Sequence, residues 1–154
     1  MATTITPSTL TVTVKEDINI NGSVNGSENT KILTVNEIFK RIVTCPASQE
    51  TTVLKFASSV NVQPGDLAVG DCKYLRITNK DDTNAVKVAY VTTNTVLTIN
   101  LAAGNSHVFG APALLAIADD DTTTPAFPTL ENLVSVVIDP ATNAVDVEVF
   151  AASA

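Results

Sequence analysis

The sequence has few of the residues that build catalytic and metal sites. Its 154 residues include no Trp, one His and two Cys. A structural zinc site takes about four Cys or His ligands, and a cupin-type metal enzyme would need two or more histidines. Cys45 and Cys72 form no CxxC pair, and His107 is distant from both in the chain. We therefore expect no metal site, no cofactor and no enzymatic activity.

Catalytic motifs are missing as well. The chain contains no Ser-His-Asp order, no GxSxG, no HExxH and no P-loop. His107 lies between Ser106 and Val108 on an expected strand and has no acidic or thiol partner nearby in sequence, so a packed or surface role is favoured over catalysis. For Cys45 and Cys72, two buried free thiols are favoured over one disulfide. No catalytic residue is predicted.

The sequence also lacks a basic surface and a long apolar run. Charged residues make up only 16%, and nine basic residues face sixteen acidic ones, for a net charge of -7. A duplex-binding domain needs a basic footprint, so direct nucleic-acid binding is not expected. No stretch approaches the ~20 apolar residues of a membrane span. The first residues have no basic start, so we expect no secretory signal and synthesis in a cytoplasm.

What the chain does have is the alternating pattern of β-strands. Hydrophobic residues reach 45% but aromatics only 5%, so the core must consist of Val, Ile, Leu and Ala. In residues 9–15, apolar positions alternate with Thr and Lys, as in a strand with one buried face. The segments that predict further strands are 52–57, 73–78, 86–90, 97–101, 113–118, 134–138 and 145–149. Of these, 113–118 is apolar throughout and is expected to be buried on both faces.

Short strands separated by Gly, Pro, Asn and Asp are typical of two packed sheets. The spacing predicts an all-β fold, an antiparallel β-sandwich with a jelly-roll-like arrangement. We expect one sandwich domain over residues 9–154, preceded by a flexible N-terminal arm over residues 1–8.

Residues 34–43 fit two structures. Thr34 and Glu37 are spaced as a helical capping box. As a strand, the same segment would place Phe39, Arg41 and Val43 on one side. The strand is favoured because the surrounding pattern is β.

The sequence contains one stretch that matches the calcium-binding loop pattern at every position. Asp17, Asn19, Asn21, Gly22 and Glu28 match D-x-[DN]-x-[DN]-G-x5-E. The residues before it alternate as a strand, whereas a calcium hand needs a helix there, and Asn-Gly is an ordinary hairpin turn. A turn is therefore favoured over a metal site.

The run of carboxylates at residues 119–121 could hold a hard cation. Like-charged runs are more often solvated loops, and that interpretation is favoured here.

Several stretches together resemble a known class of proteins. They are VTVKEDINING at 12–22, NEIFKRIVT at 36–44, KYLRITNKDDTNAV at 73–86 and DVEVFAASA at 146–154, with the turn at 101–104. They resemble small β-rich virion proteins of tailed bacteriophages, notably phages of aquatic bacteria and cyanobacteria. The resemblance covers most of the chain from about residue 9. Its motifs are strand-and-turn signatures, so no functional residue carries over, and it implies a virus particle without indicating head or tail.

Among virion roles, the expectation is a capsid decoration (cement) protein that binds the major capsid protein on the capsid surface. We expect a homo-oligomer, with a trimer favoured. A surface with few charged residues can be covered by another protein without stranding charge. A tail, neck or fibre-associated virion protein is the first alternative. A carbohydrate-binding β-sandwich module is the second, although two Tyr, five Phe and no Trp disfavour an aromatic platform.

Overall fold

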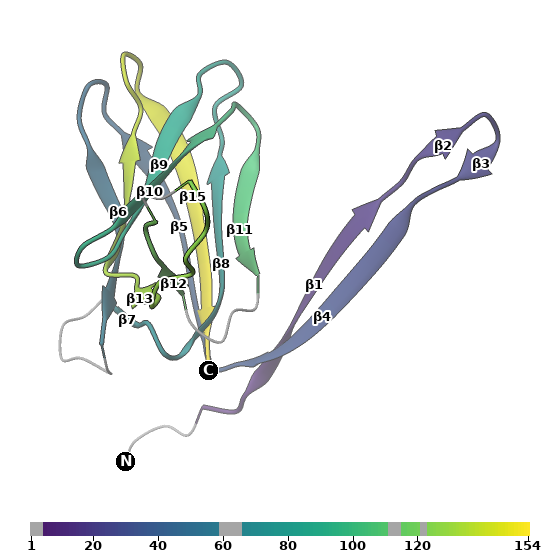
Figure 1. Cartoon of the computed structure of the whole chain (residues 1–154), viewed down its shortest axis with the longest axis horizontal. Helices are drawn as coiled ribbons and strands as arrows, with labels where there is room; N and C mark the ends of the chain where they lie inside the picture. Colours follow the sequence, from purple (N-terminus) through teal and green to yellow (C-terminus); the bar gives the residue numbers. More distant parts are fainter. Residues whose placement is uncertain (1–4, 59–65, 111–114, 121–122) are drawn as a thin grey trace.

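The computed structural model describes residues 5–58, 66–110, 115–120 and 123–154. Over these residues the regular structure consists of strands, with no helix. Most of the strands form two sheets that face each other, and a separate two-stranded ribbon projects from them (Figure 1). The predicted all-β antiparallel sandwich is confirmed.

Each sheet contains strands from both halves of the chain. The first sheet has the order β11-β8-β15-β5, and the second has the order β10-β9-β14-β6-β7. All pairings are antiparallel except that of β6 with β7. The bounds of these strands are β5 Glu37–Cys45, β6 Thr51–Ala57, β7 Leu67–Ala68, β8 Cys72–Asn79, β9 Val86–Val91, β10 Val96–Leu101, β11 Ser106–Gly110, β14 Ser135–Asp139 and β15 Val145–Ser153.

The core lies between the two sheets and is mainly aliphatic. In β15 the buried positions Val145, Val147 and Val149 alternate with Asp146 and Glu148, which lie on the outer face. Tyr90 is the largest fully buried side chain of the core. The expectation of a core built chiefly from Val, Ile, Leu and Ala is met.

The ribbon, called the hairpin arm below, consists of residues 8–35. Strand β1 (Ser8–Glu16) pairs along its whole length with β4 (Ser27–Val35), and the ribbon continues through β2 (Asn19–Ile20) and β3 (Ser23–Val24). The hairpin arm pairs with neither sheet and leads away from the sandwich (Figure 1). At ~3.3 Å per residue it is roughly 40 Å long.

This arrangement corrects the sequence prediction at residues 9–35. The strand that begins at Thr9 was expected within the sandwich, and residues 27–33 were given no strand. Alternation shows that one face of a strand is apolar, but it does not show which surface covers that face. Of the flexible segment expected at 1–8, residues 1–4 lie outside the described part, and Ser8 begins β1.

The structure decides the ambiguous segment 34–43 and shortens the strand expected at 113–118. Residues 34–43 are extended, with a break at Asn36 between β4 and β5, so the strand prediction is confirmed. Residues 113–114 lie outside the described part, and the rest of the expected strand 113–118 shrinks to β12 (Ala116–Ile117), paired with β13 (Glu131–Asn132). Leu115 and Ile117 are buried in the core, so an apolar run here marks burial without a long strand.

The other predicted strands agree with β6, β8, β9, β10, β14 and β15 to within one residue at their starts, although β15 runs on to Ser153. The Asn21-Gly22 turn is also confirmed. Both residues have positive φ, 52° and 82°, and Ile20 pairs with Ser23, as in a two-residue type I′ hairpin.

Gly26 is expected to be essential for the ribbon. A Cβ at this position would lie 2.3 Å from the backbone oxygen of Glu16. Gly26→Ala should therefore force the two strands apart at a cost of about 1–3 kcal/mol to arm pairing. Amide hydrogen exchange should show faster exchange in the hairpin arm and unchanged exchange in the sandwich.

The matched control is Gly70→Ala, because a Cβ at Gly70 meets nothing within 4 Å. Equal exchange rates in Gly26→Ala and the wild type would contradict this role.

Candidate interaction surface

The base of the hairpin arm is packed against the outer face of the four-stranded sheet. Val35 from β4, Tyr74 from β8 and Ala152 from β15 form a small buried cluster. Leu10, Leu33 and Phe150 pack against this cluster from the sides, together with Val12. The pairing of Leu10 with Leu33 places both on the same face as Val35, so one face of the ribbon covers the sheet.

The same apolar face continues beyond the sandwich. Val14, Ile18 and Ile20 follow Leu10 and Val12 at a spacing of two or four residues, which keeps them on one face. Their side chains are 56%, 46% and 53% exposed. We call these three residues the apolar stripe. It is a row of aliphatic side chains that stay about half exposed in the described part of the chain.

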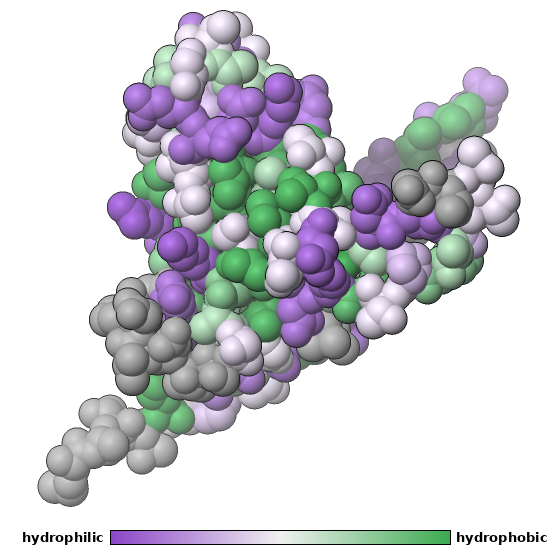
Figure 2. Space-filling model, turned by 60° about the vertical axis from the view of Figure 1, so that its left-hand side comes forward, coloured by the Kyte–Doolittle hydropathy of each residue, from purple (hydrophilic) through white to green (hydrophobic). Residues whose placement is uncertain are grey.

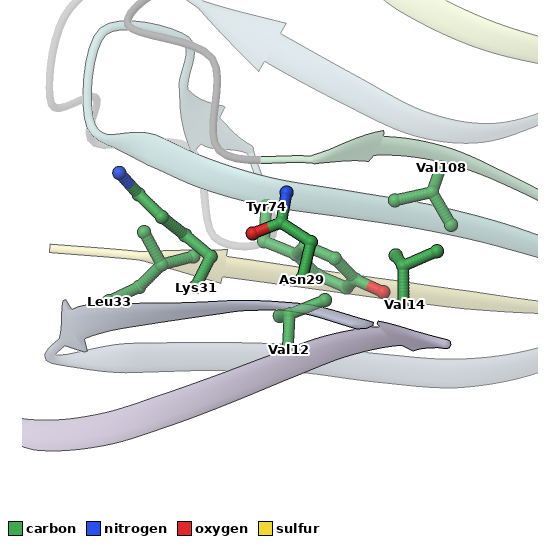
Figure 3. Close-up of a pocket in the computed structure, with 7 residues that line it drawn as sticks. All are labelled: Val12, Val14, Asn29, Lys31, Leu33, Tyr74 and Val108. Carbon is green, nitrogen blue, oxygen red and sulfur yellow. The ribbon is translucent and has the colours of Figure 1, made fainter. Parts of the chain in front are cut away.

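A groove lies where the hairpin arm departs from the sandwich. Its volume is about 310 Å³. The lining residues are Val12, Val14, Asn29, Lys31, Leu33, Tyr74 and Val108. Figure 3 shows the side chains of β1 and β4 directed toward β8 and β11, with Val14 facing Val108. The groove therefore has apolar side chains on both walls, with the polar Asn29 among them, and Lys31 is the one charged residue in its described lining.

The end of the hairpin arm carries the opposite charge. Residues 15–28, called the arm tip below, contain three acidic residues and one basic residue. Lys15 is paired with Asp17, Nζ to Oδ2 at 2.7 Å. Ser27 donates a hydrogen bond of 2.6 Å to Glu16, and Glu28 lies opposite Lys15 in the register. The arm tip thus combines apolar side chains with a net negative charge.

Beyond the hairpin arm, the outer face of the four-stranded sheet is held by an ionic network. Arg76 Nη2 lies 2.5 Å from Glu148 Oε1. Lys40 Nζ lies 3.8 Å from Oε2 of the same carboxylate. Burial alone would raise the pKa of Glu148, but the hydrogen bond and charge of Arg76, with Lys40, hold it below its ordinary value. On edge strand β5, Ile38 and Ile42 are each 57% exposed. This face is therefore mixed, apolar at its edge and charged at its centre.

The five-stranded sheet presents a second shallow hollow on its own outer face. It has a volume of about 330 Å³ and is lined by Ala89, Val91, Val96 and Val137, with Lys87 and Asp139 among its polar residues. Figure 2 brings forward the side on which β6 and β10 lie in Figure 1, and hydrophobic side chains gather across its middle. Lys87 Nζ lies 3.5 Å from Asp139 Oδ2, and this ion pair contributes polar groups to the hollow.

His107 joins the two sheets. Its Nδ1 lies 2.7 Å from the hydroxyl of Tyr90 on β9, and its ring also contacts Phe109. Burial lowers the pKa of His107 and raises that of Tyr90. Of the packed and surface roles that the sequence left open, the packed one is observed, and the three rings form a cluster between the sheets.

The two cysteines are buried free thiols that lie far apart. Cys45 pairs with Val145 and Cys72 pairs with Ser153, so they flank opposite ends of β15, about 25 Å apart at strand spacing. A disulfide needs Cα atoms within ~7 Å. Burial raises the pKa of Cys45, and raises that of Cys72 to about 11. The preference for free thiols over a disulfide is confirmed.

The calcium pattern folds as a hairpin and does not form a loop around an ion. Asn19 lies in β2, Asn21 forms the turn, and Asp17 is paired with Lys15. Of the carboxylates at 119–121, residue 121 lies outside the described part, and Asp120 accepts a hydrogen bond from the backbone of Ala126. In the described ranges no group of three or more His, Cys, Asp or Glu is placed to hold a metal.

The apolar stripe and the groove were missed on the sequence. A signal was present, because Asn21-Gly22 separates the alternation of 10–20 from a second alternation at Lys31, Leu33 and Val35. Two alternating runs around an Asn-Gly turn predict a hairpin. No sequence pattern shows that the outer half of such a hairpin stands clear of the body.

Comparisons with known proteins identify no family. No protein-family model and no curated protein sequence matches the chain. A solved structure described as "Bacillus endospore appendages form a novel family of disulfide-linked pili" is similar over 75% of this chain and 88% of its own, at 16% identity and a TM-score of 0.37. That score is too low to support a conclusion about this protein. No helix in the described residues is long and apolar enough to cross a membrane.

His107 should make stability depend on pH in a defined window. Because its folded pKa is lowered from 6.5, the folded state binds this proton less well than the unfolded state. The contribution is therefore complete above pH 6.5 and is lost as the pH falls from there through the lowered pKa. Urea unfolding from about pH 7.5 to about pH 5 should show falling stability, and His107→Phe should flatten this slope.

The control is Tyr90→Phe. It should lower the free energy of unfolding by about 1 kcal/mol at every pH through loss of the hydrogen bond, and leave the slope in place. An unchanged slope in His107→Phe would show that another group titrates.

The two cysteines should be inert in the folded protein. Their burial and raised pKa values leave little accessible thiolate. A thiol reagent should label the native chain slowly and label two thiols per chain at once in denaturant. Rapid native labelling, or a band shift under non-reducing conditions, would contradict the observed burial.

Proposed function

We propose that the protein is a non-enzymatic structural subunit of a tailed bacteriophage, a capsid decoration protein that binds the major capsid protein as a homo-oligomer. The resemblance of its strand-and-turn motifs to virion proteins supplies the setting. The observation that carries the proposal is the hairpin arm, which holds an uncovered row of aliphatic side chains away from the sandwich.

A two-stranded ribbon has little stability of its own in water. An isolated hairpin is at best marginal, and three strands or a packed face are needed for independent stability. Only the base of this hairpin arm has such a packed face. Its outer half gains stability once another protein covers the apolar stripe. A binding role accounts for an element that folding of the sandwich does not require.

The body of the molecule is suited to an architectural role. Numbered in chain order from β5, and leaving out the short strands, the two sheets read 1-8-3-6 and 2-7-4-5. We infer a jelly roll from this order, which has the two Greek keys of that fold. Jelly rolls occur in viral capsid proteins, although a fold alone does not assign a function.

The low charge of the chain supports extensive contact with other subunits. Both outer faces combine exposed aliphatic residues with ion pairs that are already satisfied within the chain. Covering such surfaces leaves few charges without a partner. Several modest contacts on neighbouring capsid subunits would then add up through avidity.

The carbohydrate-binding alternative receives little support from the aromatic residues. Sugar platforms use exposed aromatic faces. Tyr74 and Tyr90 are buried, and Phe127 is the one strongly exposed aromatic side chain in the described part of the chain. A single exposed ring does not form a platform. The tail, neck or fibre alternative is separated from the capsid role by location in the particle.

The proposal is tested on phage particles that lack the protein. Heads should still assemble but should release DNA at a lower temperature than wild-type heads. Gold labelling and gel densitometry of wild-type particles should give many copies per head. Labelling confined to the tail, or unchanged heat stability of the heads, would reject the capsid role.

A matched variant tests the hairpin arm in this role. Replacing residues 16–27 by Asn-Gly would join the register partners Lys15 and Glu28 by a short turn and keep the packed base. Purified variant added back to heads lacking the protein should bind much more weakly than wild type. Equal binding would show that the sandwich alone makes the contact.

A further inference from the structure

We propose that the arm tip of one copy docks into the groove between the hairpin arm and the sandwich of a second copy of this chain. The inference rests on the homo-oligomer proposed above and identifies its contact surfaces. Two observations carry it, the matching apolar character of arm tip and groove, and their opposite charge.

The apolar match comes from side chains of the same kind. The arm tip presents Ile18 and Ile20, each about half exposed, on the face that packs on the sheet at its base. The groove presents Val12, Leu33 and Val108 on its two walls (Figure 3). The groove is continuous with the buried cluster around Tyr74, which lines both. An incoming aliphatic side chain would therefore extend packing that already exists within one chain.

The positive charge in the groove favours a partner segment that carries negative charge. Lys31 lines the groove without an acidic neighbour in that lining, and the described residues contain no ion pair to it within 4.0 Å. In the arm tip, Asp17 is engaged by Lys15, which leaves Glu16 and Glu28 as excess negative charge. Complementary charge of this kind favours the correct partner and orientation. An aliphatic segment flanked by carboxylates is what the groove accepts, and the arm tip is such a segment.

Mutual docking would also stabilise the ribbon, which has little stability of its own. Each arm tip would gain a packed face from its neighbour, and each groove would be filled. Because every copy carries both surfaces, the contact can close into a symmetric ring or dimer. The number of copies follows from the angle between hairpin arm and sandwich, and it is measured directly in the test.

Sedimentation velocity of the full chain provides the first test. The wild type should sediment at a multiple of 16.1 kDa. The double variant Ile18→Ser, Ile20→Ser should sediment as a monomer at the same concentration. The control is Val96→Ser, because Val96 is equally exposed but lies on β10 of the opposite sheet. It should associate like the wild type, and all variants should keep the wild-type circular dichroism.

A charge exchange provides the second test. Lys31→Glu alone and Glu16→Lys alone should each raise the dissociation constant about tenfold or more, because each places like charges together. Mixing the two variants should restore association, since every contact between unlike chains then joins opposite charges. Recovery on mixing is not expected from a variant that is simply misfolded.

The outcomes separate this inference from the proposed function. A wild-type chain that stays monomeric up to millimolar concentration overturns the inference. Association that survives the Ile18→Ser, Ile20→Ser variant, or that fails to recover on mixing, also overturns it. Association through the arm tip in a protein located only in the tail would reject the capsid role and leave the inference standing.

Discussion

The packing of Val35 against Tyr74 and Ala152 determines where the hairpin arm leaves the sandwich. These three residues come from β4, β8 and β15, and they are almost completely buried on an outer face of the sheet. Because β5 begins two residues after Val35, this contact fixes the end of the ribbon to the edge of the sheet. The direction of the hairpin arm, the groove beside Tyr74 and the exposure of the apolar stripe all follow from it.

Charged residues close to the exposed apolar surfaces limit unspecific association of the protein. Edge strand β5 carries Lys40 and Arg41 at its centre, and charges on an edge strand discourage unspecific pairing with other chains. The network of Arg76, Glu148 and Lys40 places satisfied charges between Ile42 and the groove. A net charge of -7 adds general repulsion between copies. Contacts between copies are then favoured where charges are complementary.

The sandwich and the hairpin arm differ in how completely their apolar side chains are buried. The sandwich has an aliphatic core with the ring cluster of Tyr90, His107 and Phe109 across its two sheets, and its buried side-chain polar atoms in the described part have hydrogen-bond partners. Full hydrogen bonding of buried polar atoms is the normal state of a well-packed protein interior. The hairpin arm adds a row of exposed aliphatic side chains that extends away from this body. The proposed structural role would use both elements, because a packed body would carry a surface that gains stability from contact with another subunit.

Local patterns in the chain were enough to predict most strands and the turn at Asn21-Gly22. Alternation in residues such as Val145, Val147 and Val149 shows a buried face, and positive φ at an Asn-Gly pair follows from backbone sterics. The absence of Trp and the shortage of aromatic residues likewise implied an aliphatic core. These properties depend on neighbours in sequence, so the sequence alone carries them.

Long-range packing decided the rest. Leu10, Ile18 and Ile20 look alike in sequence, yet Leu10 packs on the sandwich while Ile18 and Ile20 stay about half exposed, because only the base of a ribbon fixed at Val35 reaches the sheet. The separation of Cys45 from Cys72 depends on both pairing with opposite ends of β15. The groove exists only because β1, β4, β8 and β11 meet in space. Residues this far apart along the chain acquire a common surface through tertiary packing, which no local pattern encodes.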